Sequence, residues 1–210
     1  MKRKFLAITA LGAAILVPSA LFSAQKTVVS MDFEDKTHFT VEKSSESGQI
    51  GDTRWVGFVS PGTDIRIFPD KKYNQALRLV QQEKNHGFSL TSAAAIPDNC
   101  NHTITFDTYL EKGSFLSFSG RDKNSSRLLA LMFTGNAIPK VLHNGKWKGT
   151  RCTALNGWVH VEIEVCPSQE KYSIKLTYDG DQVYEEKDIG LAKARPVAML
   201  SFVPAPHYPL

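Results

Sequence analysis

Apolar and polar residues alternate along three segments of the chain. In residues 103–110, Ile104, Phe106 and Leu110 fall on one face. Residues 158–165 and 172–178 repeat this period of two. A period of two with one apolar face is typical of antiparallel strands that cover a core, so the chain is predicted to be all-β.

Turn residues and short apolar segments extend this pattern. Asn144-Gly145 and Asp179-Gly180 are dipeptides that favour tight hairpins. The segment 128–133 is apolar on both faces, which favours a central strand, with a helical turn as the alternative interpretation. Further strands are predicted over 27–33, 65–68, 76–82, 88–91, 115–119, 128–134, 138–142, 147–152 and 197–203. Many short strands with turns between them indicate an antiparallel β-sandwich or barrel.

The first residues predict export from the cytoplasm. Basic residues at positions 2–4 precede an apolar run over 5–17, and small residues follow it. This order is typical of a secretory signal peptide, cleaved here between Ala20 and Gln25. An uncleaved anchor is a second interpretation, although the run is shorter than the roughly 20 residues of a membrane span. We expect the protein to be secreted, periplasmic or at the cell surface.

Removal of a signal peptide over 1–24 also changes the charge. The chain has 25 basic and 21 acidic residues, a net charge of +4, and loss of the three basic residues at positions 2–4 lowers it to +1. Such a nearly neutral chain gives no reason to expect nucleic acid as a partner. The remaining residues, 25–210, suit a single domain with a sizeable core. No second apolar run is long enough to span a membrane.

Five phrases in a fixed order resemble a known family. They are DFE at 32–34, YNQALRL at 73–79, TITFD at 103–107, GWVHVEIEV at 157–165 and YSIKLTYDG at 172–180. This order resembles the laminin G-like and concanavalin A-like jelly rolls of exported proteins. The resemblance implies a jelly-roll β-sandwich that binds a glycan or another cell-surface ligand without catalysis. The chain departs from the family at its end, because three prolines after Val203 forbid a central strand there.

Aromatic and charged residues near turns are the candidates for ligand binding. Trp147 follows a turn and lies between two lysines, so it is predicted to be exposed. Trp55 beside Arg54 is a second candidate, for which packing in the core is the alternative. Arg121 and Asp122, in the predicted loop after residue 118, could donate and accept hydrogen bonds to a sugar.

An alternative function is cleavage of a glycan. His160, Glu162 and Glu164 fall on one polar strand face, and alternate residues on a strand lie about 6.6 Å apart. Glycosidases separate their two carboxylates by roughly 5 to 9 Å. The run differs from the acidic motif of laminarinase-type glycosidases of this fold, so a solvated strand face is the competing interpretation. A structural envelope protein without a glycan ligand is the third function considered.

Metal and disulfide chemistry have weaker signals. No cofactor is expected, with calcium as the alternative because Asp32, Glu34 and Asp35 could supply oxygen ligands. Three cysteines in an exported chain allow one disulfide. An antiparallel meander from residue 103 to 178 would place Cys100 and Cys166 at the same end, so this pair is preferred over any pair with Cys152.

Overall fold

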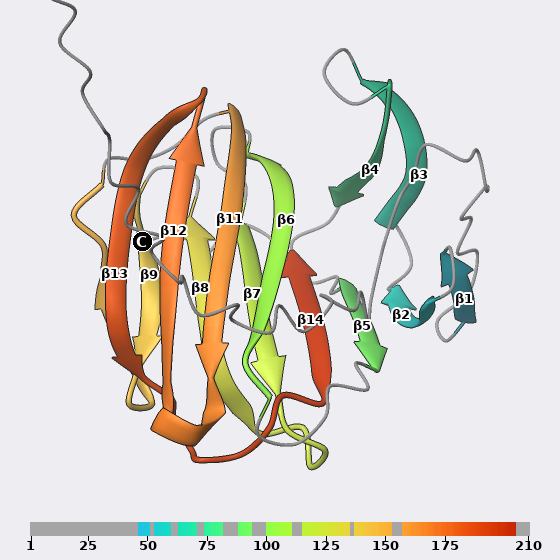
Figure 1. Ribbon diagram of the computed structural model, residues 1–210. Helices are drawn as coiled ribbons and strands as arrows, with labels where there is room; N and C mark the ends of the chain where they lie inside the picture. Colours follow the sequence, from blue (N-terminus) through green and yellow to red (C-terminus); the bar gives the residue numbers. More distant parts are fainter. Residues whose placement is uncertain are drawn as a thin grey trace, which may run out of the picture.

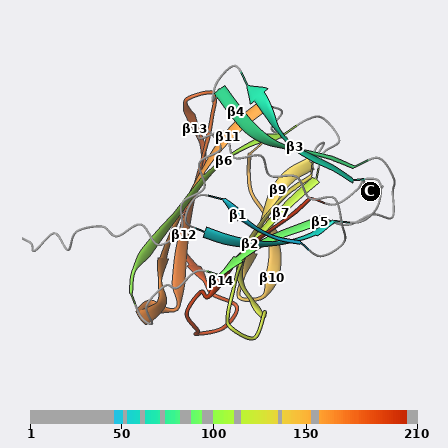
Figure 2. The same cartoon turned by 90° about the vertical axis from the view of Figure 1, so that its right-hand side faces the viewer.

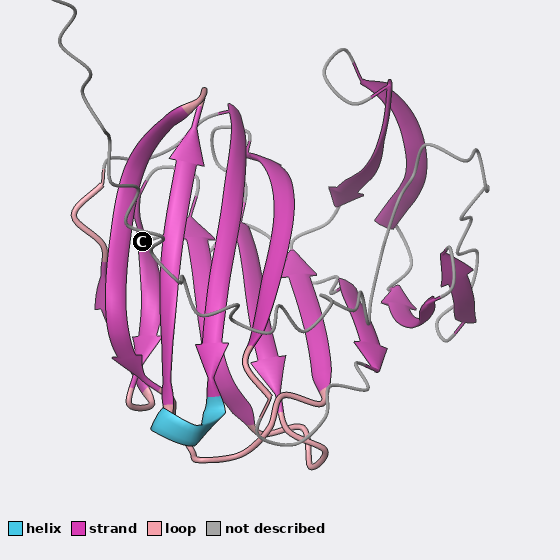
Figure 3. Cartoon of the chain, viewed as in Figure 1, coloured by secondary structure: helices cyan, strands magenta, loops and turns pink. Residues whose placement is uncertain are grey.

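The computed structural model of the chain is built almost entirely from strands (Figures 1 and 3). It describes the backbone of residues 46–50, 53–59, 63–70, 74–81, 88–93, 100–110, 115–134, 137–152 and 157–204. Side chains are described for residues 100–110, 115–133, 138–152 and 157–203. The strands are β1 (Glu46–Ile50), β2 (Thr53–Val59), β3 (Thr63–Asp70), β4 (Asn74–Gln81), β5 (Phe88–Ala93), β6 (His102–Leu110), β7 (Phe115–Arg121), β8 (Arg127–Thr134), β9 (Ala137–His143), β10 (Lys146–Gly149), β11 (Gly157–Cys166), β12 (Lys171–Tyr178), β13 (Asp181–Gly190) and β14 (Met199–Pro204). A single 3-10 turn, η1 (Pro167–Gln169), is the only helical element in these residues.

Two antiparallel sheets form the sandwich. The larger sheet has the order β1-β2-β5-β14-β7-β8-β9-β10, and the four-stranded sheet has the order β13-β12-β11-β6. The four-stranded sheet lies in front of strands β14 and β7 to β9 in Figure 1, and Figure 2 shows the same two layers from the side. The hairpin of β3 and β4 pairs only with itself among the described strands. The predicted all-β sandwich is therefore confirmed.

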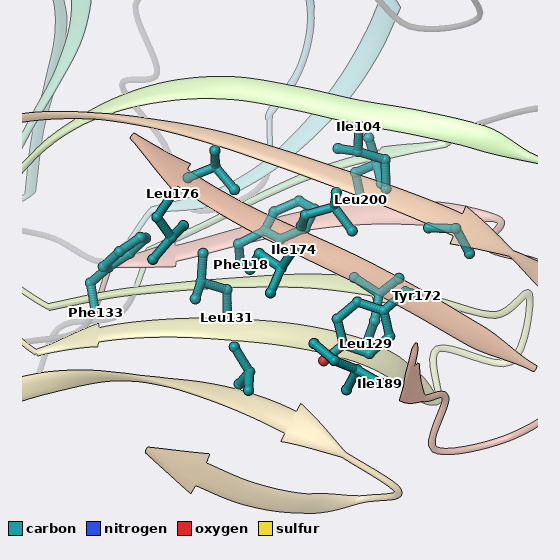
Figure 4. Close-up of a cluster of buried hydrophobic side chains, with 14 of the residues drawn as sticks. Ile104, Phe118, Leu129, Leu131, Phe133, Tyr172, Ile174, Leu176, Ile189 and Leu200 are labelled. Carbon is teal, nitrogen blue, oxygen red and sulfur yellow. The ribbon is translucent and has the colours of Figure 1, made fainter. Parts of the chain in front are cut away.

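The core fills the space between the two sheets. Phe118 of β7 is fully buried, and its ring centroid lies 4.8 Å from that of Phe106 on β6 and 5.0 Å from that of Phe202 on β14. Apolar side chains from both sheets surround this cluster (Figure 4). Alternate residues of β11 supply one wall, namely Val159, Val161, Ile163 and Val165, each at most 2% exposed. The alternation in the sequence thus becomes one buried face and one outward face.

Polar contacts join the sheets where β9 and β10 approach β12 and β13. The Tyr172 hydroxyl on β12 donates to the backbone carbonyl of Leu142 on β9. Lys148 Nζ on β10 lies 2.6 Å from Glu186 Oε1 on β13. Within β13, the Tyr184 hydroxyl donates to the same Glu186 carboxylate and helps to hold it for Lys148. These contacts fix the spacing of the layers at the edge that holds β10.

Both predicted hairpin dipeptides form turns with positive φ angles. Asn144 and Gly145 have φ values of 48° and 77°, and Asp179 and Gly180 have values of 49° and 91°. Positive φ at both central residues is the type I′ geometry, which matches the twist of the flanking strands. The turns connect β9 to β10 and β12 to β13.

The order of strands in space corrects the predicted meander. β6 and β7 follow each other in sequence but lie in different sheets, and β6 pairs with β11 instead. The segment 128–134 is a strand between β7 and β9, so the helical alternative is wrong. β14 pairs with β5 and β7 and ends at Pro204. The segment 27–33 lies outside the described residues.

Candidate functional site

The loop that joins β7 to β8 is organised around the carboxylate of Asp122. Backbone N–H groups of Asn124 and Ser126 donate to Asp122 Oδ1 at 2.9 and 2.7 Å. Arg195 donates from Nη1 to Asp122 Oδ2 at 2.8 Å. Two main-chain hydrogen bonds close the loop. The N–H of Asp122 donates to the Ser126 carbonyl, and the N–H of Ser125 donates to the Asp122 carbonyl. Both carboxylate oxygens are therefore engaged within the protein, and the side chain is only 2% exposed.

The charge of Asp122 is kept by these bonds. Burial of the carboxyl opposes ionisation, but hydrogen bonds from Arg195 and from two loop N–H groups outweigh it and hold the pKa of Asp122 below its ordinary value. The sequence suggested that Asp122 contacts a ligand directly. In the structure the bonds of this carboxylate lie within the protein and hold the loop between Arg121 and Arg127.

Arg121 and Arg127 lie opposite each other at the two ends of this loop. They are partners in the register of β7 and β8, next to a register shift after Gly120. Arg121 donates from Nε to Ser119 Oγ at 3.1 Å and from Nη1 to the Ser125 carbonyl at 3.4 Å. Since Phe118 points into the core, alternation places Ser119 on the outward face of the larger sheet, and the bond from Arg121 Nε to Ser119 Oγ places Arg121 beside it.

Trp147 of β10 lies on the same outward face as Arg127. The Arg127 guanidinium carbon lies 5.7 Å from the centroid of the Trp147 ring, which is within the range of a cation–π interaction. Burial lowers the pKa of Arg127, and the positive charge of Arg121 lowers it further. Trp147 is 38% exposed, as its place beside a turn predicted. We call Arg121, Arg127 and Trp147 the Arg–Trp surface.

The polar face of β11 holds the residues considered for catalysis. His160, Glu162 and Glu164 occupy alternate positions on one face of this strand, as predicted. His160 Nδ1 lies 3.1 Å from Asp107 Oδ1 on β6, a partner that the sequence analysis did not identify. Glu162 is paired in register with Lys175 of β12. This face thus combines carboxylates, an imidazole and a lysine on three adjacent strands.

An aromatic pair lies at one end of this polar face. The rings of Tyr109 on β6 and Trp158 on β11 meet edge to face, with centroids 5.5 Å apart. Tyr109 is 54% exposed, the largest value among the described large hydrophobic side chains. Tyr109 is not among the predicted site residues, because it interrupts the alternation of its segment.

A depression of about 350 Å³ lies at the opposite end of the same sheet. Its walls include Glu164, Lys171 and Asp188, and His102 also contributes. His102 Nδ1 lies 3.0 Å from the Cys100 carbonyl, and its Nε2 is buried without a hydrogen-bond partner. Burial lowers the pKa of His102. The imidazole is therefore neutral at pH 7.

The three cysteines are free thiols in the structure. Cys100 lies two residues before the start of β6 at His102, and Cys166 is the last residue of β11. The two cysteines therefore lie at the same end of one sheet, as predicted. The expected disulfide is not formed, because the register pairs His102 with Val165 and leaves Cys100 and Cys166 out of step. Cys152 is buried, and its Sγ lies 2.9 Å from Thr150 Oγ1.

Several predicted site residues lie outside the described side chains. Arg54 and Trp55 belong to β2, of which only the backbone is described. The possible calcium ligands Asp32, Glu34 and Asp35 precede the first described residue. Within the part of the chain that is described, no three histidine, cysteine, aspartate or glutamate side chains are grouped to hold a metal. That part also has no helix of the length and apolarity needed to cross a membrane.

Comparison with known proteins identifies a similar fold. No known protein family matches the sequence. No curated protein matches it either. A solved structure described as "Sialidase" is similar over 73% of this chain, with a TM-score of 0.55 and 15% sequence identity. The chain spans only 13% of the length of that protein. This likeness shows the β-sandwich fold.

Arg127 is the site residue that the sequence analysis missed. Two arginines at the ends of the polar stretch GRDKNSSR were the available signal, because a hairpin loop brings its two ends together. The stacking of Arg127 on Trp147 had no such signal, since 20 positions and β9 separate the two residues.

Proposed function

We propose that the protein is an exported carbohydrate-binding module of the laminin G-like and concanavalin A-like kind, without catalysis. The observation that supports this function best is the half-exposed Trp147 ring beside Arg127, with Arg121 opposite Arg127 on the neighbouring strand. An aromatic ring offers an apolar face to the C–H groups of a sugar, and guanidinium groups offer directed donors to its oxygens. A small number of placed polar groups beside aromatic side chains is typical of small-molecule sites.

The similar solved structure is compatible with this proposal. A sialidase is a glycan-cleaving enzyme, and the matched part is 13% of its chain. The name of that protein fits the glycan-cleaving alternative as well as a carbohydrate-binding module, so the likeness supports a carbohydrate-related β-sandwich in general. Export by the signal peptide would bring the module to extracellular glycans, in the medium, in the periplasm or at the cell surface.

Glycan cleavage by Glu162 and Glu164 is the second candidate function. The His160–Asp107 pair beside the carboxylates favours it, and Glu164 also lines the depression at the end of the sheet. Lys175 opposite Glu162 weighs against it, since alternating opposite charges on neighbouring strands are also typical of a solvated sheet face. A structural envelope protein is the third candidate, and it requires no site at all.

A glycan array probed with the purified protein tests the three functions. Binding without product formation supports the module, and loss of binding on chelation would show that calcium takes part. Product formation that Glu162→Gln abolishes would establish the enzyme instead. Absence of binding to every glycan, with no product from any of them, would leave the structural function.

A further inference from the structure

Charge is divided unevenly between the two sheets. Strands β7, β8, β9, β10 and β14 contain five lysines and arginines and no aspartate or glutamate. The four strands of the other sheet contain seven acidic residues and three lysines. The near-neutral net charge of the chain hides this division. These five strands therefore carry a net positive charge around the Arg–Trp surface, although Lys148 is paired with Glu186 of the other sheet.

The two arginines repel each other in the free protein. Like charges directly opposite on neighbouring strands destabilise a sheet. Arg121 and Arg127 are such partners, and among the described residues no carboxylate pairs with either guanidinium. The one acid of their loop, Asp122, is already paired with Arg195. The geometry thus maintains two adjacent positive charges without a carboxylate partner in the part of the chain that the structure describes.

Donors of both arginines remain available at this place. Arg121 uses its Nε and Nη1 atoms for Ser119 and Ser125. The Arg127 guanidinium lies over the Trp147 ring, and it makes no side-chain hydrogen bond to another described residue. A guanidinium has five N–H donors and no acceptor, and its planar fork matches the two oxygens of a carboxylate or a sulfate ester. An anionic group between the two side chains would accept from both.

We propose that the Arg–Trp surface binds acidic glycans, with the carboxylate or sulfate group of the sugar held between Arg121 and Arg127 and its ring on Trp147. This inference rests on the proposed function and adds the class of ligand. Asp122 acts as a positioning residue, because its bonds fix the loop between the arginines. Neutral glycans bind more weakly at this site, since they leave the repulsion between the arginines unrelieved.

Polysaccharides compared with and without their anionic groups distinguish recognition of the charge from recognition of the sugar. Isothermal titration of the full-length protein would compare dextran sulfate with dextran, and polygalacturonate with its methyl ester. Poly-glutamate serves as a polyanion without sugar. Arg127→Gln should weaken binding of an acidic polymer by about tenfold or more, because a hydrogen-bonded charge is lost. Arg127→Lys should recover only part of the affinity, since a lysine lacks the planar fork. Lys187→Gln removes the same charge from β13 and should leave binding unchanged.

Each result bears on the proposal in a defined way. Preference for dextran sulfate over dextran, or for polygalacturonate over its ester, supports it and identifies the sulfate or the carboxylate as the group bound. Equal affinity within both pairs, lost in Trp147→Ala but kept in Arg127→Gln, overturns the acidic class while the glycan module stands. Equal binding of poly-glutamate overturns glycan recognition at this surface. No binding of any polymer overturns the acidic class, and the glycan array then decides whether the module itself stands.

Discussion

Replacement of Phe118 by alanine tests the packing between the two sheets. The Phe118 side chain is fully buried, and its ring contacts Phe106 across the core and Phe202 on the neighbouring strand. Truncation of a buried phenylalanine costs about 3 to 5 kcal/mol, from lost apolar burial and from the cavity that remains. Domains of this kind have unfolding free energies of about 5 to 15 kcal/mol, so the variant should lose a large fraction of its stability.

Equilibrium unfolding in urea measures this loss. With an m-value near 2.5 kcal/mol/M, the midpoint of Phe118→Ala should fall by about 1 to 2 M at unchanged m. Tyr109→Ala is the matched control, because this aromatic side chain is 54% exposed and its pair with Trp158 is worth only about 0.5 to 1.5 kcal/mol. Equal midpoints for Phe118→Ala and the wild type would refute the described core.

Three further perturbations test single contacts. Tyr172→Phe should lower the unfolding free energy by about 1 kcal/mol, because it removes the donor to the Leu142 carbonyl between the sheets; an unchanged urea midpoint would count against that bond. Because the pKa of Asp122 is lowered in the folded protein, its ionised carboxylate stabilises the fold above the ordinary carboxyl pKa of about 4. This stabilisation is lost as pH falls through the lowered pKa. The unfolding free energy of Asp122→Asn should therefore fall less steeply with acidification than that of the wild type. Burial lowers the pKa of His102, so the folded state is favoured above about pH 6.5 and is destabilised as pH falls and the imidazole must take up a proton. His102→Asn should therefore lose less unfolding free energy than the wild type between pH 7 and 5. Identical profiles for variant and wild type would contradict either assignment.

The strands that the sequence predicted best are those that bury one complete face. β11 and β12 follow their alternation, with buried Val161 and Ile174 beside outward Glu162 and Lys175. β13 was missed because Ile189 is its only buried residue and polar residues fill the rest of this edge strand. β1 and β2 have no such pattern in the sequence either.

Sheet order was beyond the local pattern. Alternation shows which face of a strand is buried, but not which strand lies beside it. Consecutive strands are neighbours often enough to make a meander the natural prediction. The chain instead crosses from β6 to the other sheet at β7 and returns at β11. Cys100 and Cys166 remained at one end because β6 and β11 are antiparallel neighbours.

The candidate site shows the same division between local and long-range information. The exposure of Trp147 followed from the turn at Asn144-Gly145, which is local. Asp122 was expected to face a ligand because it is an acid in a polar loop. Its burial depends on Arg195, which lies 73 positions away in the sequence. Contacts at such separations decide which of the polar loop residues remain available to a ligand.

The central claim is that the outward face of the larger sheet binds glycan through Trp147. Titration of Trp147→Ala and Tyr109→Ala, with a glycan that the wild-type protein binds, tests it most directly. The two variants each remove an exposed aromatic ring, one from each sheet. We predict that Trp147→Ala loses affinity by about tenfold or more, as for a buried stacking contact, whereas Tyr109→Ala binds like the wild type. Unchanged affinity in Trp147→Ala together with lost affinity in Tyr109→Ala would contradict the account and place the site on the four-stranded sheet.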